Sequence, residues 1–545
     1  MSARNCGLRH RNGGLCWTCL SGTAVLAFLC IRCLSAAEPS TRDRIALGQE
    51  LFLREWVPDD SRSRGGDGLG PVFNDTSCVA CHNLGGIGGG GPATKNVDLI
   101  SAFANPPKTE TVSLGHGLTR ILVGLPWAPK KKTPPPSREE LIAEMIRINS
   151  GFRTSPSVVL HRFGTSMTYR AWLKELSNPI ATVESLENAA TNATAEVSDQ
   201  PAVSADEIKV MEDFDIDLAQ MELESLRGQT GLSDRERMFD RFNESQQIGD
   251  FLLIRSQRNA TALFGTGLID SIPTVVLEEA AQRRFAEFPG ITGRVSRLKD
   301  GRIGRYGWKA QQASLREFAM TACAVELGLH VPEHAQAGLP FIADGKAPGF
   351  DLEQSECDAL VDFLRSLDAP QERQPTSARE SRLASDGKGL FTKIGCAACH
   401  SPRLGAVDGI YSDLLLHDMG QQLADEGRYG PSVPNTSEGE VGQPTLVFAE
   451  DEEKRSKTRR TRADDTRDEA QATGALRREW RTPPLWGVRD SAPYLHDGRA
   501  ATLEEAIALH EGEAYLATKR FLKLSSSERL QIVSFLKSLI APTAK

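Results

Sequence analysis

Apolar residues recur at helical spacing in two distant stretches of the chain. Each stretch places four large apolar residues at i, i+3, i+4 and i+7, the spacing of one buried helix face. The two sets are Leu360, Phe363, Leu364 and Leu367, and Ile532, Phe535, Leu536 and Leu539. Both stretches run into an Ala-Pro pair, and proline cannot continue a helix, so we expect the helices to end before Pro370 and Pro542. The pattern predicts a mainly α chain in which one helical unit occurs twice.

Two C-x-x-C-H motifs give this repeated unit its chemistry, and an amphipathic stretch precedes each of them. The motifs consist of Cys78, Cys81 and His82, and of Cys396, Cys399 and His400. At this spacing the two thiols form thioethers to haem, and the adjacent histidine reaches the iron as an axial ligand. A thioredoxin-like dithiol would not need the histidine, and a structural zinc site would need further ligands nearby. The sequence therefore predicts two covalently bound haem c groups.

Helix, haem motif, long loop and closing helix form the plan of a cytochrome c domain, and the chain has this plan twice. We expect an N-terminal cytochrome c-like domain over 42–370 and a C-terminal one over 386–545, joined by a polar linker at 371–385. The first domain is longer and carries large insertions. One of them, near 181–233, favours a solvated helical excursion or partial disorder. The second domain contains a mixed-charge run at 428–478 that is expected to be an exposed loop.

Residues 1–37 have the order of a secretory signal peptide. Arginines precede the apolar stretch Ala24–Ile31, and small residues follow up to Ala37. The alternative is an uncleaved membrane anchor, for which the apolar run is short. No later stretch is apolar for long enough to cross a bilayer, so we expect an exported, periplasmic protein without a membrane span in its mature chain. Outside the leader and the haem motifs, Cys323 and Cys357 are either disulfide-bonded or two buried thiols.

The charge balance excludes one class of partner. The chain has 64 basic and 72 acidic residues, a net charge of −8, and so lacks the basic character of a protein that binds nucleic acid. The basic run Lys454–Arg462 is most simply part of an exposed loop, although it could dock an acidic partner. The glycine run Gly85–Gly91 lacks the Lys-Ser/Thr pair of a phosphate loop, and we expect it to pack backbone close to the first haem.

The segment Glu479–Ala514 resembles the signature of the bacterial di-haem cytochrome c peroxidase superfamily. It contains "RTPPLWGV" and "APYLHDGRAATLEEA", and members of the superfamily carry such a stretch after the second haem motif. Asp413–Gly420, Arg258–Asp270 and Gly304–Phe318 are similar to the di-haem thiol oxidoreductase branch. The resemblance covers both haem domains but neither charged insertion. It implies peroxidase-like electron transfer, substrate chemistry at the N-terminal haem, and a Ca²⁺ ion between the domains whose ligands the sequence does not identify.

The second axial ligand of each iron decides between an enzyme and an electron carrier. In the peroxidases of this superfamily, a methionine fourteen residues beyond the H-D-G histidine ligates the C-terminal haem. Counting from His496 reaches His510, so the resemblance implies a bis-histidine haem of lower potential, with Met419 as the rival ligand. The resemblance makes the N-terminal haem the substrate-facing one. Its iron is either open or capped by His116 or His161.

Three further residues have two interpretations each. His496 resembles the structural H-D-G histidine of the family, which hydrogen-bonds near the haem, or it is an ordinary buried histidine. Trp308 and Trp486 either lie beside the haems, where an aromatic ring helps electron transfer, or belong to the core. The general acid that peroxide cleavage requires cannot be named from the sequence, so no catalytic residue is assigned.

Together these features favour an exported di-haem c-type oxidoreductase. Its expected substrate is a small-molecule oxidant such as peroxide, a thiol or a protein group, and its expected partner is an electron-donor or acceptor redox protein. The alternative is a non-catalytic electron carrier with both irons six-coordinate. A third hypothesis is an interaction protein that uses the charged insertions, with haem for redox sensing.

Overall fold

The computed structural model describes residues 40–104, 136–192, 245–342, 345–370, 372–429 and 477–542. Several sequence predictions fall outside these ranges. They are the signal peptide at 1–37, the candidate ligand His116, the basic run Lys454–Arg462, residues 193–233 of the first insertion and residues 430–476 of the second. Among the described helices, none combines the length and apolar character needed to cross a bilayer.

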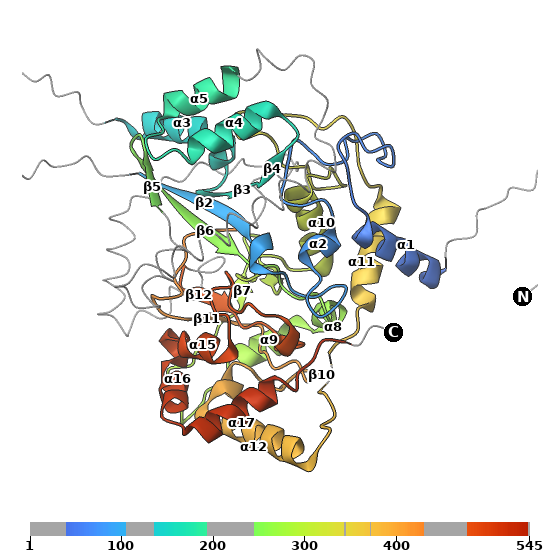
Figure 1. Ribbon diagram of the computed structural model, residues 1–545, viewed down its shortest axis with the longest axis vertical. Helices are drawn as coiled ribbons and strands as arrows, with labels where there is room; N and C mark the ends of the chain where they lie inside the picture. The colour runs from blue at the N-terminus through green and yellow to red at the C-terminus, as the bar shows by residue number, and fades with distance from the viewer. Residues whose placement is uncertain are drawn as a thin grey trace, which may run out of the picture. The chain divides into compact units, whose positions relative to one another are not determined.

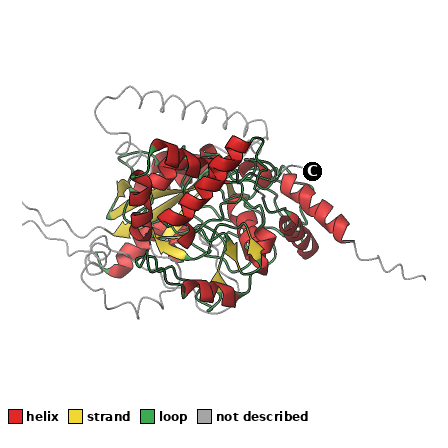
Figure 2. Ribbon diagram, turned by 90° about the horizontal axis from the view of Figure 1, so that it is seen from below, coloured by secondary structure: helices red, strands yellow, loops and turns green. Residues whose placement is uncertain are grey.

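Most of the regular structure in the described ranges is helical, as the sequence predicts (Figure 1). The helices are α1 (Thr41–Leu53), α2 (Cys78–Cys81), α3 (Arg138–Ile148), α4 (Met167–Leu176), α5 (Val183–Asn192), α8 (Thr266–Ser271), α9 (Thr274–Ala281), α10 (Leu315–Glu326), α11 (Gln354–Ser366), α12 (Ala378–Ile394), α15 (Leu503–Ala508), α16 (Tyr515–Leu522) and α17 (Ser526–Leu536). The strands lie among the helices (Figure 2) and are β1 (Val72–Phe73), β2 (Val97–Ala104), β3 (Ser157–Leu160), β4 (Phe163–Gly164), β5 (Ser245–Ile248), β6 (Phe251–Arg258), β7 (Ser296–Arg297), β8 (Ile303–Gly304), β9 (Arg403–Leu404), β10 (Val407–Asp408), β11 (Leu416–Asp418) and β12 (Glu479–Arg481).

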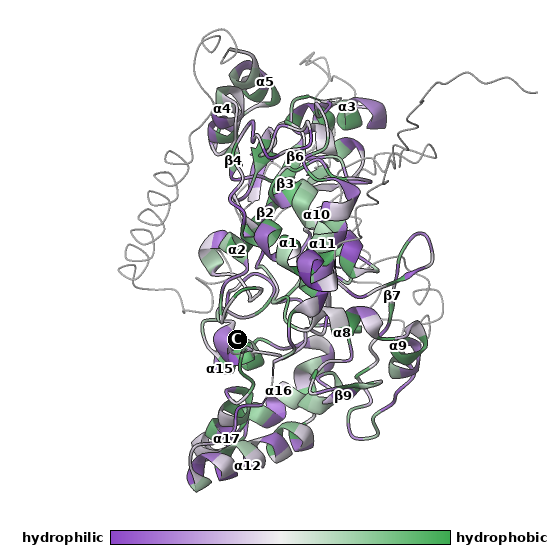
Figure 3. Ribbon diagram, turned by 90° about the vertical axis from the view of Figure 1, so that its right-hand side faces the viewer, coloured by the Kyte–Doolittle hydropathy of each residue, from purple (hydrophilic) through white to green (hydrophobic). Residues whose placement is uncertain are grey.

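Two crossing helix pairs reproduce the predicted repeat. The first apolar stripe lies on α11, which packs against α1, and the second lies on α17, which packs against α12. Both α12 and α17 carry hydrophobic and hydrophilic residues (Figure 3). A glycine allows close approach at each crossing. A Cβ on Gly48 would lie 2.0 Å from the carbonyl oxygen of Ala359, and one on Gly387 would lie 1.9 Å from that of Gln531.

An antiparallel sheet in the first half of the chain was not predicted. Its strand order is β3-β2-β6-β5, and β2 pairs with β6 along its whole length. Helices α3, α4 and α5 pack beside it around a separate core that contains Phe152, Trp172 and Phe251. The mainly α prediction therefore holds for the repeated helical unit but not for what is inserted into it. Buried and less buried residues alternate in each half of β6, and the phase of the alternation changes at the exposed Arg255.

The first insertion is helical where it is described. α5 falls within the segment near 181–233 and buries Val183, Leu186 and Ala190 in the core of the sheet region. Burial of these three residues makes α5 part of the packed structure rather than a solvated excursion.

The expected linker is shorter than predicted. α12 begins at Ala378, inside the segment 371–385, because the side chain of Ser377 accepts a hydrogen bond from the backbone N–H of Glu380 and caps the helix. Of the described linker residues, only 372–377 lie outside the helix.

The two predicted domains are not separated by their contacts. Thr41–Lys545 forms one compact unit rather than distinct units at 42–370 and 386–545. A buried ion pair between Arg258 of β6 and Asp425, 2.7 Å apart, is one of the contacts that cross the expected boundary.

Candidate functional site

The C-terminal C-x-x-C-H motif follows directly on α12. Gly395 ends the helix in a left-handed conformation (φ 112°), and a 3-10 turn then carries Cys396 toward His400. The Nδ1–H of His400 donates a hydrogen bond to the carbonyl oxygen of Tyr411 at 3.0 Å, and the ring lies 6.3 Å from that of Phe391. A hydrogen bond at Nδ1 fixes the tautomer and leaves Nε2 available to a metal.

The N-terminal motif has the same local arrangement. The Nδ1–H of His82 donates to the carbonyl oxygen of Gly89 at 3.1 Å, and its ring lies 6.4 Å from that of Phe52 on α1. The glycine run folds back tightly here, since a Cβ on Gly89 would lie 1.8 Å from the carbonyl oxygen of Leu84. The run therefore packs backbone against the first motif, as the sequence predicts.

A cavity of about 270 Å³ adjoins the C-terminal motif. Cys396, Cys399 and His400 line it, together with His510 and mainly apolar side chains. Burial, and after it the nearby imidazole of His510, lower the pKa of His400 to about 4. Burial also lowers the pKa of His510, whose Nδ1–H donates to the carbonyl oxygen of Ala506 at 2.6 Å. Two neutral histidines thus border one cavity, each with Nδ1 hydrogen-bonded to backbone.

Met419, the rival ligand, lines the same cavity. Both ligand candidates, His510 and Met419, therefore border the cavity next to the C-terminal motif. The electrostatic effect of His510 on the pKa of His400 shows that these two imidazoles lie near each other.

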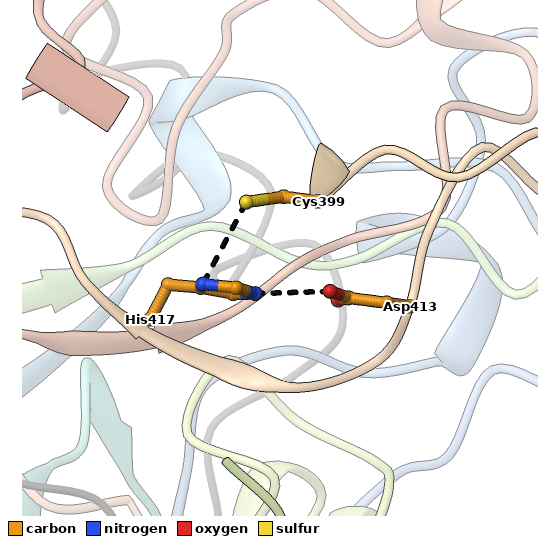
Figure 4. Close-up of side chains that lie close together, drawn as sticks. All are labelled: Cys399, Asp413 and His417. Carbon is orange, nitrogen blue, oxygen red and sulfur yellow. Dashed lines mark hydrogen bonds and ion pairs between the residues drawn. The ribbon is translucent and has the colours of Figure 1, made fainter. Parts of the chain in front are cut away.

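A buried polar cluster lies beside Cys399 (Figure 4). His417 is held between two carboxylates, with Nε2 3.0 Å from Asp413 and Nδ1 2.7 Å from Glu513, and Nδ1 also lies 3.6 Å from the sulfur of Cys399. Burial alone would lower the pKa of His417, but Cys399 and Asp413 hold it well above its ordinary value. Both ring nitrogens donate to carboxylates, which identifies an imidazolium. The sequence alone predicts no role for this cluster, although Asp413 and His417 are only four residues apart.

His496 belongs to a buried cluster at the edge of the cavity. Its ring stacks on Trp480 with the ring centres 3.6 Å apart, and its Nε2 lies 3.5 Å from a carboxylate oxygen of Asp425. The ammonium of Lys309 lies 3.5 Å from the centre of the Trp480 ring, and burial followed by the charge of Arg258 holds the pKa of Lys309 well below its ordinary value. The histidine is thus both buried and beside the cavity, so its two predicted interpretations are not exclusive.

Trp308 connects this cavity to the first motif. Its indole N–H donates to the carbonyl oxygen of Asn259 at 2.8 Å, and the Asn259 amide donates to the carbonyl oxygen of Gly91, also at 2.8 Å. Gly91 belongs to the glycine run around His82. Trp486 also lines the cavity and is buried.

Acidic residues surround Cys81 of the first motif. A carboxylate oxygen of Asp75 lies 3.4 Å from the Cys81 sulfur and 2.9 Å from the Lys95 ammonium. Glu326 accepts hydrogen bonds from the Asn74 amide at 2.7 Å and from the hydroxyl of Tyr429. Burial raises the pKa of Glu326, and burial followed by the charge of Asp75 raises the pKa of Cys81.

His161 and the two remaining cysteines have structural environments. His161 is buried, and its Nε2–H donates to the carbonyl oxygen of Val325 at 2.9 Å, which occupies the nitrogen most suited to an axial iron ligand. Cys323 and Cys357 are both buried free thiols, so the structure has no disulfide between them.

The residues present fit haem c at both motifs. Each motif offers two thiols and a histidine whose Nδ1 is fixed by a backbone carbonyl, the donor set that covalent haem attachment requires. At the C-terminal motif a mainly apolar cavity adjoins these groups, and His510 provides a second imidazole.

Comparisons with known proteins agree with this donor set. Residues 461–539 match the family described as "Di-haem oxidoreductase, putative peroxidase". The methylamine utilization protein MauG of Methylorubrum extorquens is 28% identical over 198 residues, which cover 34% of this chain and 44% of that protein. Part of the chain is thus similar to di-haem peroxidase-like proteins, and the match covers less than half the length of this relative.

Two solved structures match parts of this chain. Hydrazine synthase of Kuenenia stuttgartiensis is 18% identical, with 52% of this chain and 73% of that chain covered and a TM-score of 0.27. A MauG-like protein associated with microbial copper homeostasis is 18% identical, with 50% and 90% covered and a TM-score of 0.23. At these TM-scores the likeness carries no conclusion about function.

Proposed function

We propose that the chain is an exported, periplasmic di-haem c-type oxidoreductase with peroxidase-like electron transfer and substrate chemistry at the N-terminal haem. The duplicated motif supports this most directly. His82 and His400 each donate Nδ1–H to a backbone carbonyl and lie near a phenylalanine of the preceding helix. The proposed thioether residues are Cys78, Cys81, Cys396 and Cys399, and the proposed proximal iron ligands are His82 and His400.

The second axial ligand of the C-terminal iron is His510 in this proposal. The hydrogen bond from its Nδ1–H to Ala506 leaves Nε2 available, and it borders the same cavity as His400. For the N-terminal iron we propose an open position rather than His161, because His161 donates its Nε2–H to a backbone carbonyl. The other candidate, His116, lies outside the described residues.

When bound, the two haems would supply one-electron redox chemistry. The protein's own contribution at the N-terminal site includes a proton held at Glu326. Desolvation raises the pKa of this carboxyl, so it keeps its proton to higher pH than an exposed glutamate, and Asn74 and Tyr429 fix both of its oxygens. We propose Glu326 as the general acid that the sequence alone did not reveal.

The substrate class in this proposal is peroxide or an oxidisable thiol or protein group, with a redox protein as electron partner. The resemblance to the superfamily also leads us to propose a Ca²⁺ ion. The competing function is a non-catalytic di-haem carrier, favoured by the two histidines that border the C-terminal cavity. The carrier function also requires a second axial ligand at the N-terminal iron.

Intact mass spectrometry and peroxide kinetics test the proposal. The denatured protein is expected to retain the mass of two haems, and a Cys396→Ser/Cys399→Ser variant to retain one. Peroxide should then oxidise a pre-reduced electron donor in proportion to the protein added, and Glu326→Gln should slow this turnover while the retained mass is unchanged. Absence of covalent haem would refute the proposal. Two haems without any peroxide reaction would favour the competing function, a non-catalytic electron carrier.

A further inference from the structure

A recess of about 650 Å³ lies on the surface where α12 crosses α17. The segment before α12, the first half of α12, the end of α17 and Arg489 form its walls. Its charged side chains are the basic Arg373, Arg379, Lys388, Arg489 and Lys537 and the acidic Glu372 and Glu380. A chain with a net charge of −8 thus has a local excess of positive charge at this one recess.

Most of these charges are already paired within the protein. Lys388 lies 2.6 Å from Glu372, Arg373 pairs with Glu380, and Arg489 pairs with a neighbouring aspartate. Arg379 and Lys537 are exposed, and neither makes an ion pair within the described ranges. These two cations are therefore available to a negatively charged partner.

The floor of the recess reaches His400 through aromatic rings. Phe535 lines the recess, and its ring lies 5.3 Å from Phe391 and 5.4 Å from Tyr411. The Phe391 ring in turn lies 6.3 Å from the His400 ring. These are the centre-to-centre distances of packed aromatic pairs, so the rings form a continuous path from the recess to the proximal histidine.

A hydrogen-bonded path runs beside the aromatic one. The hydroxyl of Tyr411 donates to the carboxylate of Glu372 at 2.6 Å, and the carbonyl oxygen of the same tyrosine accepts the Nδ1–H of His400 at 3.0 Å. Tyr411 itself is 2% exposed, whereas Glu372 borders the recess. A partner seated in the recess would be separated from His400 by one buried residue.

The equivalent crossing of α1 and α11 carries its charges differently. Arg44 lies 2.8 Å from Asp362, and Arg365 lies 3.2 Å from Asp270 and 3.6 Å from Asp362. Both of these arginines are therefore paired with acids of the same region.

We propose that this recess is the docking site for an acidic surface of an electron-transfer protein, and that electrons pass between that protein and the C-terminal haem through Tyr411 and Phe391. The inference rests on the proposed function, because it needs a haem at His400. One electron moves per encounter, from the reduced centre of one protein to the oxidised centre of the other, and no bond forms or breaks.

Stopped-flow oxidation of the fully reduced holoprotein tests the proposal. The oxidants are ferricyanide, which is anionic, and hexaammineruthenium(III), which is cationic, and the readout is the absorption of the low-spin ferrous haem. The test variant is Arg379→Glu/Lys537→Glu. The control is Arg382→Glu/Lys523→Glu, which changes the total charge by the same amount at exposed cations outside the recess.

At low ionic strength, ferricyanide should oxidise the test variant about tenfold more slowly than the control. Reversing two positive charges at the recess should lower the association rate of an anion there by about this factor. Hexaammineruthenium(III) should not be slowed by the same change. Salt at about 0.5 M should remove the difference through screening. Equal ferricyanide rates in the two variants would overturn the proposal, whereas a wild-type protein without haem absorption would refute the proposed function instead.

A competition experiment tests the kind of partner. A short glutamate peptide should slow ferricyanide oxidation of the native protein and of the control, but not of the test variant. Glutarate at the same carboxylate concentration and ionic strength should have little effect. A molecule this small cannot contact Arg379, Lys537 and the walls of the recess at the same time. Equal inhibition by glutarate would assign the recess to small anions and overturn the docking of an acidic protein surface.

Discussion

The buried pair of Arg258 and Asp425 is expected to be costly to break. The guanidinium makes two hydrogen bonds to the carboxylate, at 2.7 and 2.9 Å, and the side chains are only 5% and 3% exposed. Arg258 also donates to the carbonyl oxygen of Gly427, and burial would raise the pKa of Asp425 if Arg258 did not hold it well below its usual range. The pair joins β6 to the C-terminal half of the chain.

Removing one charge leaves the other buried without its partner. Asp425→Asn should therefore lower the free energy of unfolding by about 3–5 kcal/mol. Arg147 and Glu187 provide the matched control, since they also form two hydrogen bonds, both 2.6 Å, but are 42% and 43% exposed. Solvent screens such a pair, so Glu187→Gln should cost no more than about 1 kcal/mol.

Guanidinium unfolding of the holoprotein, followed by tryptophan fluorescence and by haem absorption, measures both variants. The slope with denaturant should be unchanged, so that a lower midpoint reports lower stability. If Asp425→Asn and Glu187→Gln differ by less than about 1 kcal/mol, the reasoning from burial is wrong. Retained stability in Asp425→Asn would also show that this pair does not hold the two halves together.

Three further predictions concern a buried acid, a helix crossing and an axial ligand. The pKa of Glu326 is raised in the folded state, so the stability that its proton provides should be present at acidic pH and decline as the pH rises from about 4.5 through the folded pKa. Melting temperatures measured between acidic and neutral pH should show this decline in the native protein but not in Glu326→Gln. Gly387→Ala should lower the free energy of unfolding by about 1–3 kcal/mol, because its Cβ would collide with Gln531. Gly389→Ala on the same helix meets nothing within 4 Å and should raise the free energy of unfolding by about 0.5–1 kcal/mol. Equal denaturation midpoints for the two variants would argue against the close crossing. His510→Met should raise the midpoint potential of the C-terminal haem in a spectropotentiometric titration, while Met419→Leu should leave it unchanged; the opposite result would make Met419 the ligand.

Local patterns in the sequence were sufficient for the haem motifs and the helices beside them. The i, i+3, i+4, i+7 stripes identify α11 and α17 because a buried helix face imposes that spacing. The count from His496 to His510 also led to a residue at the cavity. Each of these signals lies within one short segment of the chain.

Features that depend on distant contacts were not predicted. β2 pairs with β6, more than a hundred residues away, and nothing local to either strand specifies that partner. The same applies to His417, whose second carboxylate comes from Glu513. Glu326 looks like an ordinary helical glutamate until Asn74 and Tyr429 are seen to fix its oxygens.

Low-temperature EPR of the holoprotein, oxidised and half-reduced, tests the central claim most directly. The account predicts one low-spin ferric signal from the bis-histidine C-terminal haem and one high-spin ferric signal from an open N-terminal haem, present at once or appearing on half-reduction. Added peroxide should remove the high-spin signal. Two low-spin signals in every state, unchanged by peroxide, would contradict the account and identify an electron carrier.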